Sequence, residues 1–392
     1  MEPRERTRRA TSVAHKPIVD IELYFGHMED PRIERRKLHK LLDIIVIAIC
    51  AVICGADNWV DIQHFGERKK AWLQQFLALP NGIPSHDTFG RVFSRLNAEQ
   101  FQACFLEWVK AVNQVTKGQV VAMDGKQVRR SMDNYRGKGA IYMVSAWAEE
   151  NRIVLGQRKV ADKSNEITAI PELLDLLEVA GCIVTIDAIG CQKEIAQKIV
   201  TRGADYVLAV KENQPRLYES IEYLFRLPLQ EEDPMQWIED HHKTVDKGHG
   251  RVEIRQCWTL RAANYLECAP GLQDWPKLQS LVRMTSQRKV GEQVRQEVRY
   301  YISSLEPKAK KILSAIRGHW GIENRLHWVL DVSFDEDHNR ARKDHAPANL
   351  TVIRHIAMNL LRQEKTAKGG IQAKRLQAAW DESYLLQILS ST

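Results

Sequence analysis

One pattern occurs twice in the chain: a short apolar, β-branched run that leads into an aspartate. Residues 119–126 read QVVAMDGK and carry Asp124, and residues 182–190 read CIVTIDAIG and carry Asp187 at the matching position. Such runs, broken by glycine or another small residue, predict short buried strands. Because Asp-Gly is a common turn pair, the first copy alone would favour a simple turn. The second copy changes that interpretation, since a carboxylate is costly to bury unless it binds something positive.

A third acidic residue, Glu323, lies in the segment 316–330, which reads IRGHWGIENRLHWVL and has helical periodicity. Two strand-end aspartates and one helix-borne glutamate are the ligands that a two-metal phosphodiester site needs. Hard cations such as Mg²⁺ take oxygen ligands and bind only a few protein carboxylates, which leaves positions for water and phosphate. Two such ions can hold the attacking and leaving oxygens of an in-line displacement.

Size and composition are those of an ordinary soluble globular protein. The chain has 392 residues, enough for two or three domains, and its net charge of +7 weakly favours a polyanionic partner. Seven cysteines without a Cys-x-x-Cys pair predict a reduced, cytoplasmic chain with no disulfide framework or zinc ribbon. The longest apolar run, 44–56, is too short to span a bilayer comfortably, so we expect a buried helix there and no membrane association.

The periodicity divides the chain into three parts. Residues 1–116 are predicted to form an all-helical N-terminal domain that binds DNA or is associated with the catalytic domain. Residues 117–345 are predicted to form an α/β catalytic domain, and residues 346–392 C-terminal helices. The catalytic domain is interrupted by a β-rich insertion at 227–305, where alternating runs follow proline breaks.

Within the catalytic domain the expected order is three strands, a helix, a strand, a helix and a strand. Runs at 140–147 and 152–160 follow the Asp124 strand closely and predict an antiparallel meander. A helix then precedes the strand 182–187, and a helix at 191–202 precedes the strand 205–210. This order predicts a mixed α/β sheet with helices on its faces.

In the N-terminal region, a turn at 80–82 and a capping Ser85 lead into a helix that carries Arg91 and Arg95. A short helix, a tight turn and a basic second helix fit a helix-turn-helix DNA reader. An ordinary helical hairpin with solvated arginines fits equally well, and both interpretations stay open.

Four segments in this order, 121–126, 185–192, 205–214 and 319–328, resemble those of the DDE transposases of bacterial insertion sequences, in particular the H-repeat-associated branch. The resemblance covers nearly the whole chain. It implies a ribonuclease H-like catalytic core in which Asp124, Asp187 and Glu323 are the catalytic triad and bind two Mg²⁺, for which Mn²⁺ can substitute.

The resemblance also implies the reaction and the partners. The expected activity is metal-dependent cleavage of DNA at insertion-sequence ends and strand transfer into target DNA. The expected partners are the terminal inverted repeats and the target DNA, with a homodimer in the synaptic complex. The alternative function is a non-catalytic DNA-binding relic of such an element, and a third option is a nuclease that cuts but no longer integrates.

The wider cut-and-paste group has a Tyr-x-x-Arg-x-x-x-Glu-x6-Lys signature, from which this chain departs. Ile316, His319 and Leu330 stand at the Tyr, Arg and Lys positions, so the DNA contacts of that signature cannot be transferred directly. Candidate substitutes for these contacts are the following basic residues: Arg317, His319, Arg325 and His327.

Two further segments are expected to contact DNA. Lys126 closes the first of the family-like segments. The segment 247–255 resembles a recurring motif of this branch, and its basic residues His249, Arg251 and Arg255 suit phosphate contacts. The alternative for that segment is a hairpin turn with exposed charges.

Other polar residues around Glu323 favour structural interpretations. His319, Glu323 and His327 share one helical face, but successive turns spread them over ~12 Å at 1.5 Å per residue, too far for all three to bind one zinc ion. Trp320 and Trp328 are expected to pack inside the protein. The acidic residues that follow, Asp331, Asp335, Glu336 and Asp337, are expected to be mostly solvated and to pair with Arg340 and Arg342.

Overall fold

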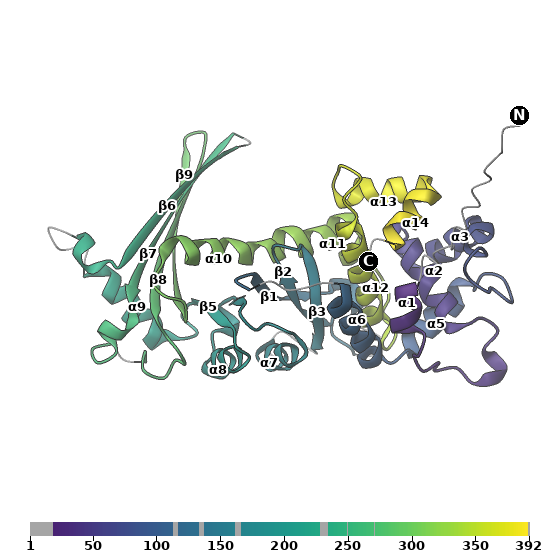
Figure 1. Ribbon diagram of the computed structural model, residues 1–392, viewed down its shortest axis with the longest axis horizontal. Coiled ribbons are helices and arrows are strands. Elements are labelled where there is room, and N and C mark those ends of the chain that lie inside the picture. Colours follow the sequence, from purple (N-terminus) through teal and green to yellow (C-terminus); the bar gives the residue numbers. More distant parts are fainter. Residues whose placement is uncertain are drawn as a thin grey trace, which may run out of the picture.

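The computed structural model describes residues 19–112, 117–132, 137–160, 166–227, 234–248, 250–269 and 271–390. The molecule is elongated (Figure 1), with helices gathered at one end, a sheet across the middle and a β arm at the other end. Helix α10 (Ala309–Gly321) runs along the long axis and connects the arm with the helical end.

The N-terminal region is helical, as predicted. Its helices are α1 (Val19–Phe25), α2 (Leu41–Ile53), α3 (Trp59–Arg68), α4 (Lys70–Leu73), α5 (His86–Arg95) and α6 (Ala98–Val112). The apolar run that begins the 44–56 segment forms α2, which is buried on nearly every side. Over the residues that the structure describes, no helix combines the length and the apolar character needed to cross a bilayer.

The central sheet begins with the predicted antiparallel meander. Its strands are β1 (Val120–Gln127), β2 (Tyr142–Ala148), β3 (Ile153–Val160), β4 (Ile183–Ile186) and β5 (Asp205–Val210). β4 and β5 run parallel to β1, and these five strands lie in the order β3-β2-β1-β4-β5. Helices α7 (Glu166–Leu176) and α8 (Lys193–Thr201) lie below the sheet in Figure 1, while α10 lies above it. The mixed α/β sheet with helices on both faces is therefore confirmed.

The β-rich insertion exists, but it is not a separate small unit. After α9 (Pro215–Arg226) come four antiparallel strands: β6 (Asp240–Gly248), β7 (Arg251–Arg261), β8 (Ser280–Val290) and β9 (Gln293–Ser303). β9 pairs with β5, for example Tyr300 with Val210, so the insertion extends the catalytic sheet to nine strands. The outer halves of these strands form the arm in Figure 1.

β1 is longer than the sequence predicted. The strand was expected to break at Gly125, but it continues to Gln127 because β2 keeps pairing with it, Asp124 with Ser145 and Gln127 with Tyr142. Gly125 lies inside the strand. A glycine fits this position because a Cβ atom there would collide with the Glu166 carboxylate. Only the parallel pairing with β4 stops before Asp124.

The C-terminal helices pack against both the N-terminal helices and the sheet. Helix α10 continues through a π-helical turn (Ile322–His327) into α11 (Trp328–Ser333), and α12 (Ala346–Gln363), α13 (Ile371–Trp380) and α14 (Glu382–Leu389) follow. α12 packs against α2, α5, α6 and β3, so the N-terminal helices share a hydrophobic core with the sheet. The predicted C-terminal helices are present, and α13 and α14 are separated at Asp381, whose side chain caps α14.

Candidate active site

Asp124 and Asp187 lie side by side at one edge of the parallel part of the sheet. Met123 of β1 pairs with Ile186 of β4, and each aspartate is the next residue in its own segment. The Asp187 side chain accepts a hydrogen bond of 3.1 Å from the Ile189 N–H and so caps the short 3₁₀ turn Ala188–Gly190. The parallel register therefore brings two carboxylates, separated by many residues in sequence, to the same edge.

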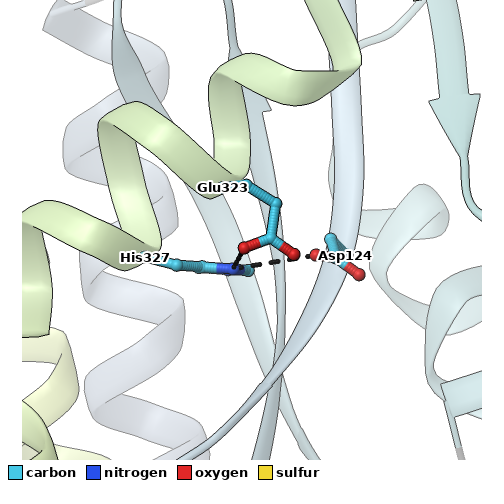
Figure 2. Close-up of side chains that lie close together, drawn as sticks. All are labelled: Asp124, Glu323 and His327. Atoms are coloured by element: carbon cyan, nitrogen blue, oxygen red, sulfur yellow. Dashed lines mark ion pairs between the residues drawn. The ribbon is translucent and has the colours of Figure 1, made fainter. Parts of the chain in front are cut away.

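Glu323 reaches this edge from the helix above it. Figure 2 shows its carboxylate between Asp124 and His327, with Glu323 and His327 on the helix and Asp124 on β1. His327 Nδ1 lies 3.6 Å from Glu323 Oε2 and 3.7 Å from Asp124 Oδ2. One ligand atom from each of these residues lies within 4.8 Å of the others, a spacing at which the residues could hold a metal ion.

The helix changes its hydrogen bonding at this point. The Trp328 N–H donates to the Glu323 carbonyl, five residues back, and the turn Ile322–His327 is π-helical. Such turns occur frequently at functional sites, because the wider turn re-aims the side chains that it carries. Here the turn carries both Glu323 and His327, which accordingly face the same strand.

The three predicted carboxylates line one cleft. Its volume is about 750 Å³, and it extends from the ends of β1 and β4 toward β9. Besides the carboxylates, its polar and aromatic lining includes Lys211, Glu212, Asn213, Tyr218, Arg299, Tyr300, His319 and Trp320. The cleft thus combines clustered acidic groups with basic and aromatic groups.

The electrostatics of the cluster fit a cation site. Burial, together with the negative charges of Glu323 and Asp187, raises the pKa of Asp124 well above its usual range. The neighbouring His327 imidazole lowers the pKa of the Glu323 carboxyl, so the two carboxyl groups are shifted in opposite directions. A bound divalent cation would remove the repulsion that raises the pKa of Asp124. Two carboxylates, a third one nearby and an imidazole nitrogen form a suitable donor set for Mg²⁺ or Mn²⁺.

His319 also belongs to this cleft. Its Nδ1 lies 3.1 Å from Thr185 Oγ1 on β4, and burial lowers its pKa. The imidazole is therefore neutral at pH 7 and can act as a hydrogen-bond donor or acceptor in the cleft.

Lys126 has a different environment from the one predicted. Its side chain is only 11% exposed, and its ammonium lies 2.7 Å from Asp331, 3.0 Å from Glu336 and 3.2 Å from Asp337. These contacts tie β1 to α11 and to the segment that follows it. Three carboxylates already surround the ammonium, so a DNA phosphate would compete with them for Lys126, and the DNA contact stays a prediction.

The acidic residues after Glu323 were expected to be mostly solvated, and for Glu336 this expectation is wrong. Glu336 is 1% exposed and pairs with Lys126 and Arg354. The attraction of these cations outweighs the cost of burial and holds the pKa of Glu336 at about 2. Among the described residues, no ion pair joins Arg340 or Arg342 to the acidic residues that follow Glu323.

The prediction that Trp320 and Trp328 pack inside is also wrong. Their side chains are 41% and 58% exposed, respectively. The Arg299 guanidinium of β9 lies over the Trp320 ring, 4.4 Å from its centroid. Trp320 is therefore an exposed aromatic wall of the active-site cleft, one helical turn before Glu323.

The remaining candidate DNA contacts fall into three groups. Arg91 and Arg95 are exposed on α5, and the helix-turn-helix interpretation of that region stays a prediction. Arg325 pairs with Glu149 in the turn after β2, and buried His327 lies against the carboxylates. On the arm, Arg251 pairs with Glu253, and Arg255 pairs with Asp246 and Glu253. Arg317 of α10 also pairs with Asp246. His249 lies outside the described residues.

The sequence interpretation missed the role of His327 as a neighbour of the carboxylates. The signal was present, because His327 follows Glu323 by four residues and so lies on its face of the helix. The three helical residues His319, Glu323 and His327 are too far apart to bind one ion together, and a ligand from another element was not considered. Only two of the helical residues, Glu323 and His327, belong to the cluster, and Asp124 from β1 completes it.

Comparison with known proteins places the chain in a family. The family described as "Transposase DDE domain" matches residues 115–360, and the one described as "DDE_Tnp_1-associated" matches residues 23–109. "Putative transposase YncI" of Escherichia coli O157:H7 is 42% identical over 371 residues, which cover 94% of both chains. "H repeat-associated putative transposase YhhI" of Escherichia coli (strain K12) is 42% identical over 358 residues, 90% of this chain and 93% of that protein.

A solved piggyBac transposase synaptic complex with hairpin DNA aligns with 97% of this chain and 82% of its own, but at 10% identity and a TM-score of 0.45, which is too distant to support a conclusion. The two family matches, together with the relatives that align over most of their length, are sufficient to assign the family. The chain belongs to the DDE transposase family, and its relatives include the H-repeat-associated transposases.

Proposed function

We propose that this protein is a transposase that cleaves DNA at the ends of an insertion sequence and transfers the freed strands into target DNA. One observation carries the proposal: Asp124, Asp187 and Glu323, from two parallel strands and one helix, line a single cleft. Family membership alone would not carry it, because a relative with a degraded site would share the fold. The three carboxylates of the expected triad are all present here and lie along the same cleft.

We further propose that the catalytic core is ribonuclease H-like. The support is the strand order β3-β2-β1-β4-β5, in which an antiparallel meander is followed by two strands parallel to β1. In this core the first aspartate lies on the central strand β1 and the second after its parallel neighbour β4. The β arm then enters the sheet through β9, between the second aspartate and Glu323 along the chain.

In the proposed reaction, the carboxylates of Asp124, Asp187 and Glu323 hold two Mg²⁺ ions. When bound, such ions activate water for attack on the scissile phosphate and stabilise the leaving 3′ oxygen. Asp124 must lose its proton to take part, since its pKa is raised by burial and by its acidic neighbours. His327 Nδ1 lies close to both Glu323 and Asp124, and the basic Lys211 and Arg299, which also line the cleft, suit phosphate contacts.

The proposed partners are the element ends and the target DNA. A net charge of +7 favours association with the phosphate backbone, and the affinity should fall as salt rises. A homodimer would bring two ends together, with each chain supplying one such cleft.

The experiment is cleavage of duplex DNA that contains the ends of the element around this gene. Wild type, Asp187→Asn and Asp274→Asn are compared in Mg²⁺, in Mn²⁺ and in EDTA. Asp274 is an exposed aspartate paired with Lys193, and it controls for the loss of one carboxylate. We expect metal-dependent cleavage by wild type and Asp274→Asn, and none by Asp187→Asn.

The outcomes separate the proposed function from its alternatives. Binding of element ends in EDTA without cleavage in either metal would contradict the proposal and favour a non-catalytic DNA-binding relic. Cleavage without joining to a target plasmid would favour a nuclease that no longer integrates. If Asp187→Asn cleaved DNA as well as wild type does, the assignment of Asp187 to the catalytic triad would be wrong.

A further inference from the structure

A second groove lies away from the catalytic carboxylates, at the junction of the N-terminal helices and the segment before α12. Its volume is about 440 Å³. One wall is α5, with His86, Asp87 and Arg91, and the other is the loop that carries Arg340, Arg342 and Lys343. We call the four cations Arg91, Arg340, Arg342 and Lys343, with the space between them, the basic groove.

The two walls come from segments about 250 residues apart, and hydrogen bonds fix the loop in place. The Asn339 side-chain amide donates to the Asp57 carbonyl at 2.5 Å and accepts from the Ala341 N–H at 2.8 Å. Arg342 Nε donates to the Arg130 carbonyl at 3.2 Å. The loop backbone is therefore positioned before any ligand arrives, which reduces the entropy cost of binding.

The cations of the basic groove lack acidic partners. No ion pair within the described part of the chain involves Arg91, Arg340, Arg342 or Lys343. The acids nearby have other partners: Asp87 lies 3.6 Å from His86, Asp344 3.7 Å from Lys138, and Asp335 2.5 Å from His338. On β7, by contrast, the partly exposed Arg255 and Arg261 do pair with acids.

Four unneutralised cations around one concave surface repel one another, which raises the free energy of the isolated protein. A bound polyanion would relieve this repulsion. A simple solvated surface explains each cation singly, but it does not explain an anchored loop that directs three of them toward a fourth from another region. Duplex DNA is the polyanion that fits, because its phosphates form a regular row of charges and the groove is open to solvent.

We propose that the basic groove binds the phosphate backbone of duplex DNA beside the DNA segment that occupies the catalytic cleft. This inference rests on the proposed function, since it extends the DNA path of the same enzyme. The connection to the active site is short along the structure: Arg342 bonds to Arg130, in the turn Arg129–Ser131 that follows β1, and β1 carries Asp124. The groove would thus hold the DNA by its backbone and set its register against the carboxylates.

The test is the salt dependence of DNA binding, measured in EDTA with Asp187→Asn as the background so that cleavage does not enter. The probe is duplex DNA of scrambled sequence, titrated over a range of KCl concentrations. Each phosphate contact contributes about 0.9 to the slope of log K against log salt, so the triple variant Arg340→Ala, Arg342→Ala, Lys343→Ala should lose about 2 to 3 from the slope. At about 0.1 M salt this corresponds to an affinity loss of roughly 100-fold or more.

Two further variants make the test specific. The triple variant Lys308→Ala, Lys310→Ala, Lys311→Ala removes the same charge from exposed residues at the start of α10, toward the β arm, and should change the slope by less than about 1. Arg91→Ala, on the opposite wall, should lower the slope by about 1 and does not disturb the loop. Circular dichroism and thermal unfolding of each variant establish that it is folded.

An unchanged slope in both the loop variant and Arg91→Ala would overturn the inference, as would an equal loss in the Lys308, Lys310 and Lys311 variant. A loss with duplex RNA but not with duplex DNA would overturn the assignment to DNA. The two proposals fail differently: an unchanged slope with intact cleavage by wild type rejects only the basic groove, whereas a reduced slope with no cleavage rejects only the catalytic activity.

Discussion

Nδ1 of His327 lies 3.6 Å from Oε2 of Glu323, one turn earlier on the same helix. The imidazole is 7% exposed, and its Nε2 has no hydrogen-bond partner in the described structure. A buried imidazole held against two carboxylates fixes their orientation, and one of its nitrogens can itself bind a metal. The residue thus connects the geometry of the helix with the chemistry of the carboxylates.

His327→Asn should weaken divalent-cation binding by about 10- to 100-fold, because removing a residue that orients or supplements the ligands has an effect of this size. Isothermal titration with Mn²⁺ measures the change. His338→Asn is the matched control, since His338 is exposed and pairs only with Asp335 in the described structure. An unchanged Mn²⁺ affinity in His327→Asn would remove this residue from the metal site.

Asp124→Asn should stabilise the metal-free protein by about 1 kcal/mol or more, because the carboxylate is buried against like charges that raise its pKa. For an acid whose folded pKa is raised, the penalty is absent below its unfolded pKa near 4 and grows as the pH rises above it. The stability gain should therefore be present at pH 7 and vanish near pH 4. Urea unfolding in EDTA at both pH values measures it.

The same variant should lose its response to metal. Mg²⁺ or Mn²⁺ that binds only the folded state stabilises it by about 2.7 kcal/mol at 100 times the dissociation constant. Wild type should show this gain and Asp124→Asn should not. A variant less stable than wild type in EDTA at pH 7 would show that Asp124 has a structural role instead.

Glu336 should make the protein sensitive to acid below about pH 4.5. Its pKa is about 2 in the folded protein against an ordinary value of 4.5, since attraction to Lys126 and Arg354 exceeds the cost of burial. A depressed acid pKa contributes stability above the unfolded value and loses it as the pH falls through the folded value, here over pH 4.5 to 2. The full contribution is about 3 kcal/mol at 1.36 kcal/mol per pKa unit.

Urea unfolding of wild type and Glu336→Gln from pH 7 to pH 3 tests this expectation. At pH 7 the variant should be less stable by about 3 kcal/mol, because Lys126 and Arg354 lose a buried partner. The difference should shrink as the pH falls. Glu382→Gln, which removes a carboxylate from a half-exposed ion pair with Lys69, should change stability by less than about 1 kcal/mol. A difference independent of pH would contradict the assignment.

His355 should add a second acid-sensitive region at higher pH. It is fully buried beside Phe105, neither ring nitrogen has a partner among the described residues, and burial lowers its pKa to about 4 from 6.5. A base with a lowered folded pKa favours folding above the unfolded value, and this stability declines as the pH falls from 6.5 to 4. His355→Leu should unfold with less pH dependence over that interval. An unaltered dependence would show that His355 is not responsible.

Gly321→Ala tests the close approach between the catalytic helix and the sheet. A Cβ at this position would collide with the Glu149 carboxylate, which pairs with Arg325 and accepts a 2.9 Å hydrogen bond from Trp147 Nε1. Alanine gains up to about 1 kcal/mol of helix propensity, whereas a displaced charge-assisted hydrogen bond costs about 1.5 to 3 kcal/mol. The single variant should therefore be less stable by about 1 kcal/mol.

A double-mutant cycle separates the two effects. In the Glu149→Ala background the obstacle is gone, so Gly321→Ala should become stabilising by up to about 1 kcal/mol. Urea unfolding of the four proteins of the cycle measures this reversal. The same sign of effect in both backgrounds would show that Glu149 does not determine the need for glycine.

Much of the fold could be predicted from the sequence because its signals are local. The apolar, β-branched runs before Asp124 and Asp187 predicted β1 and β4, and the helical periodicity around Glu323 predicted the helix that carries it. The close spacing of the first three strands predicted their antiparallel meander. Each of these inferences uses residues that are neighbours in the chain, where composition and periodicity report directly on local structure.

Other features depend on contacts between distant segments, and only the tertiary structure decided them. β9 joins β5 across the insertion, and Lys126 finds Glu336 about 200 residues away. The π-helical turn at Glu323 has no local signature that distinguishes it from an α-helix. The basic groove arises because the loop before α12 folds against α5. Sequence determined which residues carry charge and which segments are strands or helices, whereas the partners of each charge depended on long-range packing, for which a single sequence contains no local signal.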